Sequence, residues 1–301
     1  MRLFSVILSP FFQKEKKMNN LDYPLVSIGM PLYNEARFIE DSLSSILAQD
    51  YPHLEIIISD NASTDATLNT CQRLIGKRTN AIIHQFDNNR GVAENFRYVL
   101  SVARGKYFMW ASGHDLWTPN YVSESVALLE MTTTAVIAFG SSIWIDENGH
   151  QLPKFSGYTD TRGMNPITRF FMIFFGNMHP ILGVIRKSAL DQTQTIVSAV
   201  GADLILLSEL ALQGDFVHAT RTHWQRRDFR HESNHAEKLK RYRSSEYGLT
   251  RSLYNVYFPL FRLPLELARN VIHSELRTLE KVAVLLALVA SLPVRYLAGK
   301  Q

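Results

Sequence analysis

The feature that most constrains the fold is an alternation of short apolar runs with amphipathic segments in the first third of the chain. Four apolar runs have the length and composition of buried strands, and the segments between them carry apolar residues at helical spacing. The predicted strands are 25–30, 54–59, 81–85 and 107–111, and the predicted helices include 38–49, 68–74 and 96–103. This alternation favours an α/β fold with a mostly parallel sheet and helices on both faces.

The alternation weakens after Trp117, so we expect the second half of the chain to be mixed. The predicted elements are helices at 121–130 and 203–212, strands at 135–145 and 181–185, and a hairpin turn at 146–149. We expect a leader at 1–23, a main domain at 24–235 and a helical tail at 236–301.

Polar blocks follow each of the first four predicted strands. They are Pro31–Glu35, Asp60–Asp65, Asn88–Gly91 and Ser112–Asp115. Because an open α/β sheet binds its ligand at the carboxyl ends of its strands, we expect these blocks to form one site.

The first three blocks have the residue types of a nucleotide site. Asp60 can accept a hydrogen bond from the imide N–H of a pyrimidine base, although Asp also stabilises turns. Tyr33, Asn34 and Glu35 would face the same crevice and help to enclose a base and a ribose. Arg90 and Gly91 precede a predicted helix, where phosphate binds well, but a turn glycine beside an exposed arginine explains them equally.

Other features exclude competing classes of protein. The chain has neither the glycine-rich opening of a dinucleotide site nor a complete P-loop. Its single cysteine, Cys71, excludes an intrachain disulfide framework and fits a reducing compartment. A net charge of +4 suits phosphates or an anionic membrane surface, but this excess is small, and we expect no nucleic-acid partner.

The order of the four blocks resembles the family 2 glycosyltransferases, whose Rossmann-like GT-A fold opens with a similar series: Pro-x-Tyr-Asn-Glu, Asp-x-x-Ser-Thr-Asp, Asn-x-Gly and Asp-x-Asp-Asp. The resemblance covers roughly residues 24–235. It implies transfer of a sugar from a nucleoside-diphosphate donor to an acceptor hydroxyl. The implied donor-binding residues are Pro31, Tyr33, Asn34, Glu35, Asp60, Asn61, Arg90, Gly91 and Asp115.

The fourth block departs from the family pattern. Ser112 and His114 stand where the family has two acids, so that only Asp115 remains. Mg2+ prefers oxygen ligands, whereas an imidazole is compatible with Mn2+. We expect a divalent metal, Mn2+ or Mg2+, on His114 and Asp115, with His231 as a possible further ligand. The alternatives are a hydrogen-bonding role for His114 and a solvated basic loop around His231.

An inverting transferase needs a general base beside the acceptor hydroxyl. The resemblance assigns this role to Asp203, at the start of a predicted apolar helix, whereas the alternative role of Asp203 is to cap that helix. Glu209 and Asp215 are less favoured as bases. The leaving diphosphate also requires positive charge, for which the candidates are a metal ion, Arg90, Arg226, Arg227 and Arg230.

The tail contains an apolar segment, 282–294, flanked by Arg277, Lys281 and Arg295. It is too short to span a bilayer, and it is interpreted either as a membrane-surface helix or as a helix buried in the domain or a dimer. With this segment, the resemblance implies a bacterial enzyme, cytoplasmic and peripheral on the inner face of the membrane. The expected donor is a UDP- or dTDP-sugar, and the expected acceptor is a glycan or lipid-linked glycan in cell-surface polysaccharide synthesis. The alternatives are a nucleotide-sugar-binding protein without catalysis and a membrane scaffold.

Overall fold

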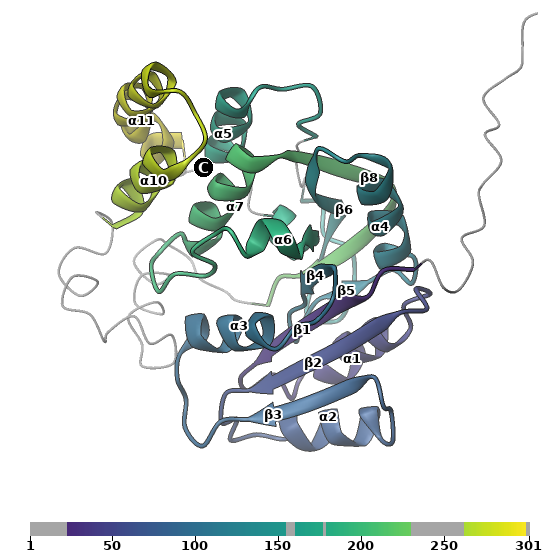
Figure 1. Ribbon diagram of the computed structural model, residues 1–301. Helices are drawn as coiled ribbons and strands as arrows, with labels where there is room; N and C mark the ends of the chain where they lie inside the picture. Colours follow the sequence, from purple (N-terminus) through teal and green to yellow (C-terminus); the bar gives the residue numbers. More distant parts are fainter. Residues whose placement is uncertain (1–22, 155–159, 177–178, 230–261, 299–301) are drawn as a thin grey trace, which may run out of the picture.

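The structure is a computed structural model that describes residues 23–154, 160–176, 179–229 and 262–298 (Figure 1). The expected leader at 1–23 lies outside the described residues except for Tyr23, as does the start of the tail, residues 236–261. The domain boundaries near 23 and 236 therefore stay predictions.

One mixed sheet forms the centre of the molecule. Its strand order is β3-β2-β1-β4-β7-β6-β8-β5. The strands are β1 Val26–Leu32, β2 Leu54–Asp60, β3 Ala81–Gln85, β4 Tyr107–Trp110, β5 Leu116–Trp117, β6 Ala135–Ile145, β7 Val184–Arg186 and β8 Asp215–Arg227. The pairs among β1 to β4 are parallel, as is β6 with β8, whereas β7 and β5 run antiparallel to their neighbours. This arrangement confirms the predicted α/β class with a mostly parallel sheet.

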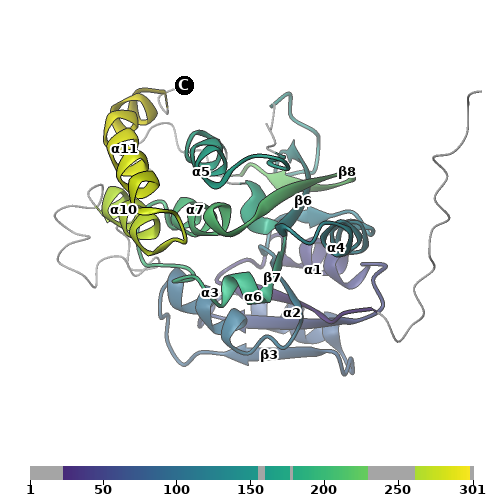
Figure 2. The same ribbon diagram turned by 45° about the horizontal axis from the view of Figure 1, so that its top comes forward.

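Helices cover both faces of the sheet, as predicted (Figure 2). They are α1 Ile39–Leu47, α2 Thr67–Ile75, α3 Val92–Ser101, α4 Tyr121–Met131, α5 Pro166–Phe175, α6 Lys187–Leu190, α7 Ala202–Gln213, α10 Arg262–His273 and α11 Thr278–Ala298, with a 3-10 turn at His179–Leu182. Helices α1, α2 and α4 pack in one apolar cluster, and α3, α5, α7, α10 and α11 pack in the other.

Strand β4 shows why the predicted strands read as continuous apolar runs. Its residues alternate between the two clusters: Tyr107 and Met109 pack with α1 and α4, and Phe108 and Trp110 pack with α3 and α5. A strand buried on both faces must be apolar at every position. The four-residue strand is accordingly buried throughout.

The prediction of a strand at 181–185 is only partly right. The carbonyl of Pro180 accepts the N–H of Gly183 at 2.8 Å and closes a 3-10 turn, so the strand starts at Val184. Sequence analysis also missed β8, the longest strand of the described sheet, which pairs with β6 and β5.

The C-terminal helices extend the main domain. Helix α10 packs on α7, where the Asn270 side chain donates to the Ile205 carbonyl and to Ser208 Oγ, each at 2.8 Å. Helix α11 packs on α10 and touches α5 (Figure 2). The predicted helical extension is therefore present, and within the ranges given above no helix has the length and apolarity that crossing a membrane requires.

Candidate functional site

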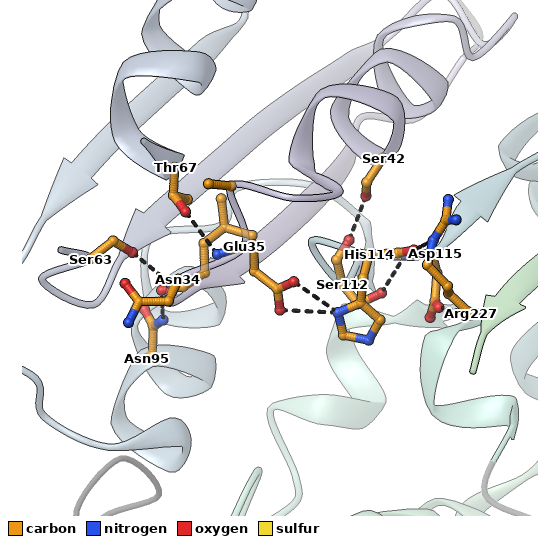
Figure 3. A network of polar contacts seen from close by, with 12 residues as sticks. Asn34, Glu35, Ser42, Ser63, Thr67, Asn95, Ser112, His114, Asp115 and Arg227 are labelled. Atoms are coloured by element: carbon orange, nitrogen blue, oxygen red, sulfur yellow. Dashed lines mark hydrogen bonds and ion pairs between the residues drawn. The ribbon is translucent and has the colours of Figure 1, made fainter. Parts of the chain in front are cut away.

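The segments that follow β1 and β2 are hydrogen-bonded to each other (Figure 3). The N–H of Asn34 donates to Ser63 Oγ at 2.9 Å, and the Asn34 side-chain oxygen accepts the N–H of Thr64 at 2.9 Å. The N–H of Glu35 donates to Thr67 Oγ1 at 2.8 Å. Asn34 has a φ of 52°, a left-handed conformation that Asn tolerates better than most residues. The first and second polar blocks thus form one rigid unit.

Asp65 strengthens this unit. Its carboxylate accepts the N–H of Ala36 at 3.1 Å and the N–H of Thr67 at 3.0 Å. Burial acts to raise the pKa of the Asp65 carboxyl, but the hydrogen bonds from Thr67 and Ala36 outweigh it, so this pKa lies below its usual value. Asp65 therefore joins the start of α2 to the segment after β1.

Asp60 ends β2 opposite Leu32 of β1, and its side chain is fully buried. One carboxylate oxygen accepts the N–H of Ser63 at 3.0 Å, which is the turn role that the sequence allowed. Among the residues that the structure describes, the other oxygen, Oδ1, has no hydrogen-bond partner. Leaving a buried acceptor unpaired is costly, so Oδ1 is suited to accept a hydrogen bond from a ligand.

The third block is tied to the second through two asparagines. The Asn61 side chain accepts the N–H of Arg90 at 2.9 Å and donates to Asn89 Oδ1 at 3.0 Å. Asn89 Oδ1 also accepts the N–H of Gly91, whose φ of 86° needs a glycine. The exposed guanidinium of Arg90 stacks over the Phe86 ring at 4.4 Å. These contacts hold Arg90 immediately before α3.

The fourth block reaches the first through a histidine–carboxylate pair (Figure 3). His114 Nδ1 lies 3.0 Å from Glu35 Oε1, and both side chains are mostly buried. A Cβ on Gly113 would lie 2.7 Å from Glu35 Cγ, so only glycine allows the two segments to approach this closely. Ser112 Oγ accepts the N–H of Asp115 at 3.2 Å. Ser112 therefore shapes the turn in which the family has an acid.

Arg227, at the end of β8, holds the fourth block in place through hydrogen bonds from its backbone and its guanidinium. We call these contacts the Arg227 clamp. Its N–H donates to Asp115 Oδ1 and its Nε to the His114 carbonyl, both at 2.9 Å. Nη1 donates to the Glu147 carbonyl at 2.9 Å, and the guanidinium lies 4.6 Å from the centroid of the Phe38 ring. The Arg227 side chain is only 3% exposed. Arg227 is the least suited of the candidate cations within the described residues to meet a diphosphate, because its side chain is buried and its Nε and Nη1 donors hold the loop.

The residues at His114 and Asp115 fit a metal ion only together with a ligand. In the described ranges, no three His, Cys, Asp or Glu side chains cluster in a way that would hold a metal. Asp115 provides a carboxylate whose Oδ1 is shared with Arg227, and His114 provides Nε2, because Nδ1 faces Glu35. A metal here would take its remaining ligands from phosphate oxygens and water. His231 and Arg230 lie outside the described residues.

Asp203 lies in the first turn of α7 and is exposed to solvent. The capping position belongs to Gly201, which has a φ of 81°, so Asp203 is not the helix cap. Although the side chain is accessible, the surrounding protein raises the pKa of its carboxyl through desolvation, and the charge of Arg226 partly offsets this rise. Asp203 therefore lies within electrostatic range of Arg226 of β8.

The two less favoured acids are occupied elsewhere. Glu209 is partly buried and accepts the N–H of Gln194 at 3.1 Å. Asp215 is buried and forms an ion pair with Arg169 at 3.1 Å. Of the three acids that the sequence offered as bases, only Asp203 is exposed to solvent.

The remaining predicted site residues also lie at the carboxyl end of a strand of the sheet. Pro31 is near the end of β1, and Tyr33 follows that strand, partly buried. Sequence reasoning missed several residues that shape the site, which are Phe38, Phe86, Gly113 and Phe229. The Phe229 ring lies 4.9 Å from the His114 ring and 5.0 Å from the Phe38 ring, and it closes an aromatic wall beside the histidine. Nothing local in the sequence marks these contacts, because their partners are distant along the chain.

A match to a known protein family includes all four polar blocks. The sequence profile described as Glycosyl transferase family 2 matches residues 27–190. An uncharacterized glycosyltransferase of Rickettsia bellii is 31% identical over 137 residues, which cover 45% of this chain and 19% of that protein. The putative teichuronic acid biosynthesis glycosyltransferase TuaG of Bacillus subtilis is 31% identical over 134 residues, which cover 44% of this chain and 52% of TuaG. The chain thus spans about a fifth to a half of these relatives.

Solved structures share the fold at low sequence identity. Staphylococcus aureus TarS 1–349 in complex with UDP-GlcNAc aligns with a TM-score of 0.65 and 16% identity, over 88% of this chain and 71% of TarS 1–349. The mannosyltransferase PcManGT of Pyrobaculum calidifontis, in complex with GDP-Man and Mn2+, aligns with a TM-score of 0.53 and 20% identity, over 90% of this chain and 81% of PcManGT. These alignments confirm a GT-A-like fold.

Proposed function

This chain belongs to glycosyl transferase family 2, and on that premise we propose that it is an inverting enzyme that transfers a sugar from a nucleoside-diphosphate donor to a hydroxyl of a glycan or lipid-linked glycan. The observation that carries the proposal is the unpaired, buried Oδ1 of Asp60, set in an edge where four polar blocks are tied into one unit. Such an acceptor suits a ligand that brings its own N–H group.

We propose that Asp60 accepts the imide N–H of a uracil or thymine base. Tyr33, Asn34 and Glu35, with Pro31 and Asn61, then line the nucleoside pocket, because they surround Asp60 on the same edge. Arg90 and the N-terminus of α3 at Gly91 are placed for the diphosphate. The UDP-GlcNAc bound by TarS supports this donor class, whereas the GDP-Man bound by PcManGT shows that the fold also accepts a purine.

We propose that Asp203 is the general base. Its carboxylate takes the proton of the acceptor hydroxyl while the oxygen attacks the anomeric carbon, and the bond from that carbon to the nucleoside diphosphate breaks. Attack on the face opposite the leaving group inverts the anomeric centre. The raised pKa of the Asp203 carboxyl makes it a better proton acceptor than an ordinary aspartate, and the nearby Arg226 favours its ionised form.

A divalent cation fits this proposal at Asp115 and His114. When bound, it would neutralise charge on the leaving diphosphate. One carboxylate and one imidazole nitrogen form a donor set that suits Mn2+ better than Mg2+. The Glu35 carboxylate fixes the His114 ring, and the Arg227 clamp fixes Asp115, so both side chains are positioned before any ligand arrives.

The proposed setting is the synthesis of a bacterial cell-surface polysaccharide, at the inner face of the cytoplasmic membrane. The similarity to TuaG, named for teichuronic acid biosynthesis, supports this setting. The loss of the two acids at Ser112 and His114 favours one alternative, a protein that binds the donor without turning it over.

Donor binding and transfer can be tested separately. UDP, dTDP, GDP and CMP are each added to the protein with EDTA, Mg2+ or Mn2+, and the thermal midpoint is recorded, because a ligand of the native state raises it. We expect UDP or dTDP to raise the midpoint, more strongly with Mn2+. No shift with any nucleotide contradicts the donor site. A second outcome is that the wild type binds the UDP-sugar without transferring the sugar to any candidate acceptor. If Asp203→Asn then behaves in the same way, the result favours the non-catalytic alternative.

A further inference from the structure

The side chains of the first polar block reach two different partners. Asn34 Oδ1 accepts the N–H of Thr64 in the second block at 2.9 Å, whereas the carboxylate of Glu35 reaches the fourth block (Figure 3). Glu35 Oε1 lies 3.0 Å from His114 Nδ1, and Oε2 lies 3.2 Å from the same nitrogen. The family resemblance counts Glu35 among the donor-binding residues, yet both of its carboxylate oxygens face a side chain of the protein.

The backbone on both sides of this contact is fixed by hydrogen bonds. The N–H of Glu35 donates to Thr67 Oγ1 at 2.8 Å, and the Glu35 carbonyl accepts the N–H of Ile39 at 2.9 Å. On the other side, Arg227 Nε donates to the His114 carbonyl at 2.9 Å. The His114 and Glu35 side chains are only 15% and 16% exposed. The contact is therefore part of the fold and does not depend on two mobile surface side chains.

The contact determines which nitrogen of the His114 ring carries a proton. A carboxylate only accepts hydrogen bonds, so Nδ1 must be the donor. In a neutral imidazole the other nitrogen, Nε2, then keeps its lone pair, which is the group that binds a cation. A histidine that ligates a metal almost always donates its second ring N–H to a carboxylate, a carbonyl or water. The Glu35 contact thus prepares Nε2 of His114 as a ligand.

Glu35 also brings negative charge to a block that has lost it. Ser112 and His114 stand where the family has acids, so Asp115 is the remaining acid of the fourth block. A carboxylate hydrogen-bonded to an imidazole makes the ring a stronger ligand. Because the pair is mostly buried, solvent and salt screen its charge less than they would at the surface. The first block can therefore restore part of the charge that the fourth block lacks.

We propose that Glu35 is a positioning residue of the cation site and acts through His114. It holds the proton on Nδ1, leaves Nε2 as the ligand and replaces part of the charge lost at Ser112 and His114. The backbone of Glu35 stays part of the nucleoside pocket, but its side chain does not bind the donor. This inference rests on the proposed cation site at His114 and Asp115, and it adds to that site a residue from outside the fourth block.

A double-mutant cycle on the full chain tests the proposal. The proteins are the wild type, Glu35→Gln, His114→Ala and the double variant. Mn2+ is titrated at a saturating concentration of UDP, and free Mn2+ is followed by electron paramagnetic resonance against a blank without protein. Calorimetry measures the affinity for UDP in EDTA. The matched control is Glu40→Gln, which removes the same charge from an exposed side chain that pairs with Arg73 at 2.8 Å.

Glu35→Gln should weaken the binding of Mn2+ by about 10–100-fold, and Glu40→Gln should leave it unchanged. In the His114→Ala background, Glu35→Gln should cause no further loss, because the imidazole through which it acts is absent. The affinity for UDP in EDTA should be the same in every protein, since the Glu35 side chain does not contact the nucleoside. Equal thermal midpoints establish that folding is retained.

Three results would overturn the proposal. The first is an equal loss from Glu35→Gln in the presence and absence of His114, because Glu35 would then act on the cation without the histidine. The second is a loss of UDP affinity in EDTA, which would place the Glu35 side chain in the nucleoside pocket. The third is a wild type that binds UDP but no Mn2+. That result leaves the proposed sugar transfer standing, whereas absence of both UDP binding and transfer contradicts the proposed function itself.

A measurement on the wild type applies even if Glu35→Gln fails to fold. Heteronuclear NMR of the imidazole nitrogens, with the His114 signals assigned by their loss in His114→Ala, identifies the protonated nitrogen of the neutral ring. We expect the proton on Nδ1. A proton on Nε2 overturns the proposal, because that nitrogen could not then ligate a cation.

Discussion

The two ends of strand β2 place a carboxylate in contrasting surroundings. At the amino end, Glu55 accepts from Ser27 Oγ at 2.6 Å and from the N–H of Arg104 at 2.7 Å, and its second oxygen accepts from Arg104 Nε at 2.8 Å. At the carboxyl end, Asp60 is fully buried, and one of its oxygens has no hydrogen-bond partner within the described part of the chain. The same strand thus carries one carboxylate whose two oxygens both accept hydrogen bonds and one carboxylate with an oxygen that accepts none from the described residues.

The two carboxylates have different roles: Glu55 stabilises the fold, and Asp60 is the group that we propose binds the donor. The Glu55 group ties β1, β2 and the turn before β4 together, and Gly105 joins it by donating its N–H to Ser27 Oγ at 2.8 Å. At the other end, the unpaired oxygen of Asp60 does not stabilise the free protein. A ligand that donates to this oxygen would remove the cost, which is why we propose the carboxyl ends of the strands as the substrate site and regard the amino ends as scaffold.

The largest expected effect is on catalysis. Asp203→Asn removes the proposed base and should lower the transfer rate by about 10²–10⁴-fold. Because Asp203 caps no helix and its ionised form is disfavoured by desolvation, the thermal midpoint should not fall, and the affinity for the nucleotide should stay unchanged. Initial rates with the donor sugar, together with a nucleotide titration, measure both. A variant that keeps the wild-type rate removes Asp203 from the mechanism.

The pH profile of the wild type provides an independent check on Asp203. Since the pKa of its carboxyl is raised, the base is protonated over a wider acidic range than an ordinary aspartate. The rate should therefore fall as the pH drops, with a midpoint above the usual pKa of aspartate. In Asp203→Asn this acidic limb should vanish from any residual activity.

Glu55→Gln should act on stability alone. Replacing one acceptor oxygen by an amide breaks bonds to Ser27 and Arg104, and we expect a loss of about 1–3 kcal/mol in the free energy of unfolding. Desolvation acts to raise the pKa of the Glu55 carboxyl, but the bonds from Ser27 and Arg104 lower it overall. Its contribution is therefore full above the unfolded-state pKa and is lost as the pH falls through the folded-state pKa. Urea unfolding at neutral and acidic pH measures this, and the two proteins should converge in acid.

Asp60→Asn should act on the donor and spare the fold. The amide is nearly isosteric, but in one orientation its N–H₂ group would face the N–H of the base in place of the unpaired oxygen. We expect the affinity for the nucleotide to fall by about 10–100-fold. The thermal midpoint should fall by a few degrees at most. Equal affinity of the two proteins for UDP and for dTDP would show that Asp60 does not read the base.

The smallest expected effect is at Phe86, which supports Arg90 through a cation–π contact. Phe86→Leu keeps an apolar side chain in the buried position but removes the ring face. A contact of this kind is worth about 0.5–1 kcal/mol at an exposed site, so the affinity for the diphosphate should fall about two- to fivefold. Binding of the nucleoside without phosphates is the control and should not change.

Much of the sheet was predictable because its inner strands are buried on both faces. Such strands leave a continuous apolar run in the sequence, and β1, β2 and β4 were found in this way. Strand β3 is an edge strand without a buried residue, and only its short apolar run at 81–83 marked it. Strand β8 left a weaker mark, since its later half alternates between buried and partly exposed residues. The 3-10 turn at His179–Leu182 is followed by a bond from the N–H of Gly183 to the Pro180 carbonyl, and no periodicity reveals this turn.

The sequence predicted which loops form the candidate site, but it did not predict the contacts between those loops. Turn residues and acids mark the four blocks, and the order of strands brings them together. The Arg227 clamp on Asp115 joins residues 112 positions apart, so no local pattern signals it. The sequence also left open whether Asp203 caps its helix, a question that the backbone at Gly201 answers.

The most direct test of the account is a calorimetric titration of UDP, and in parallel dTDP, into the wild type, Asp60→Asn and Glu55→Gln, with the thermal midpoint of each protein. We predict that Asp60→Asn loses affinity at a nearly constant midpoint, while Glu55→Gln loses stability at a constant affinity. Equal affinities for all three proteins, or a loss of affinity that simply follows the loss of stability, would contradict the assignment of the carboxyl edge as the donor site.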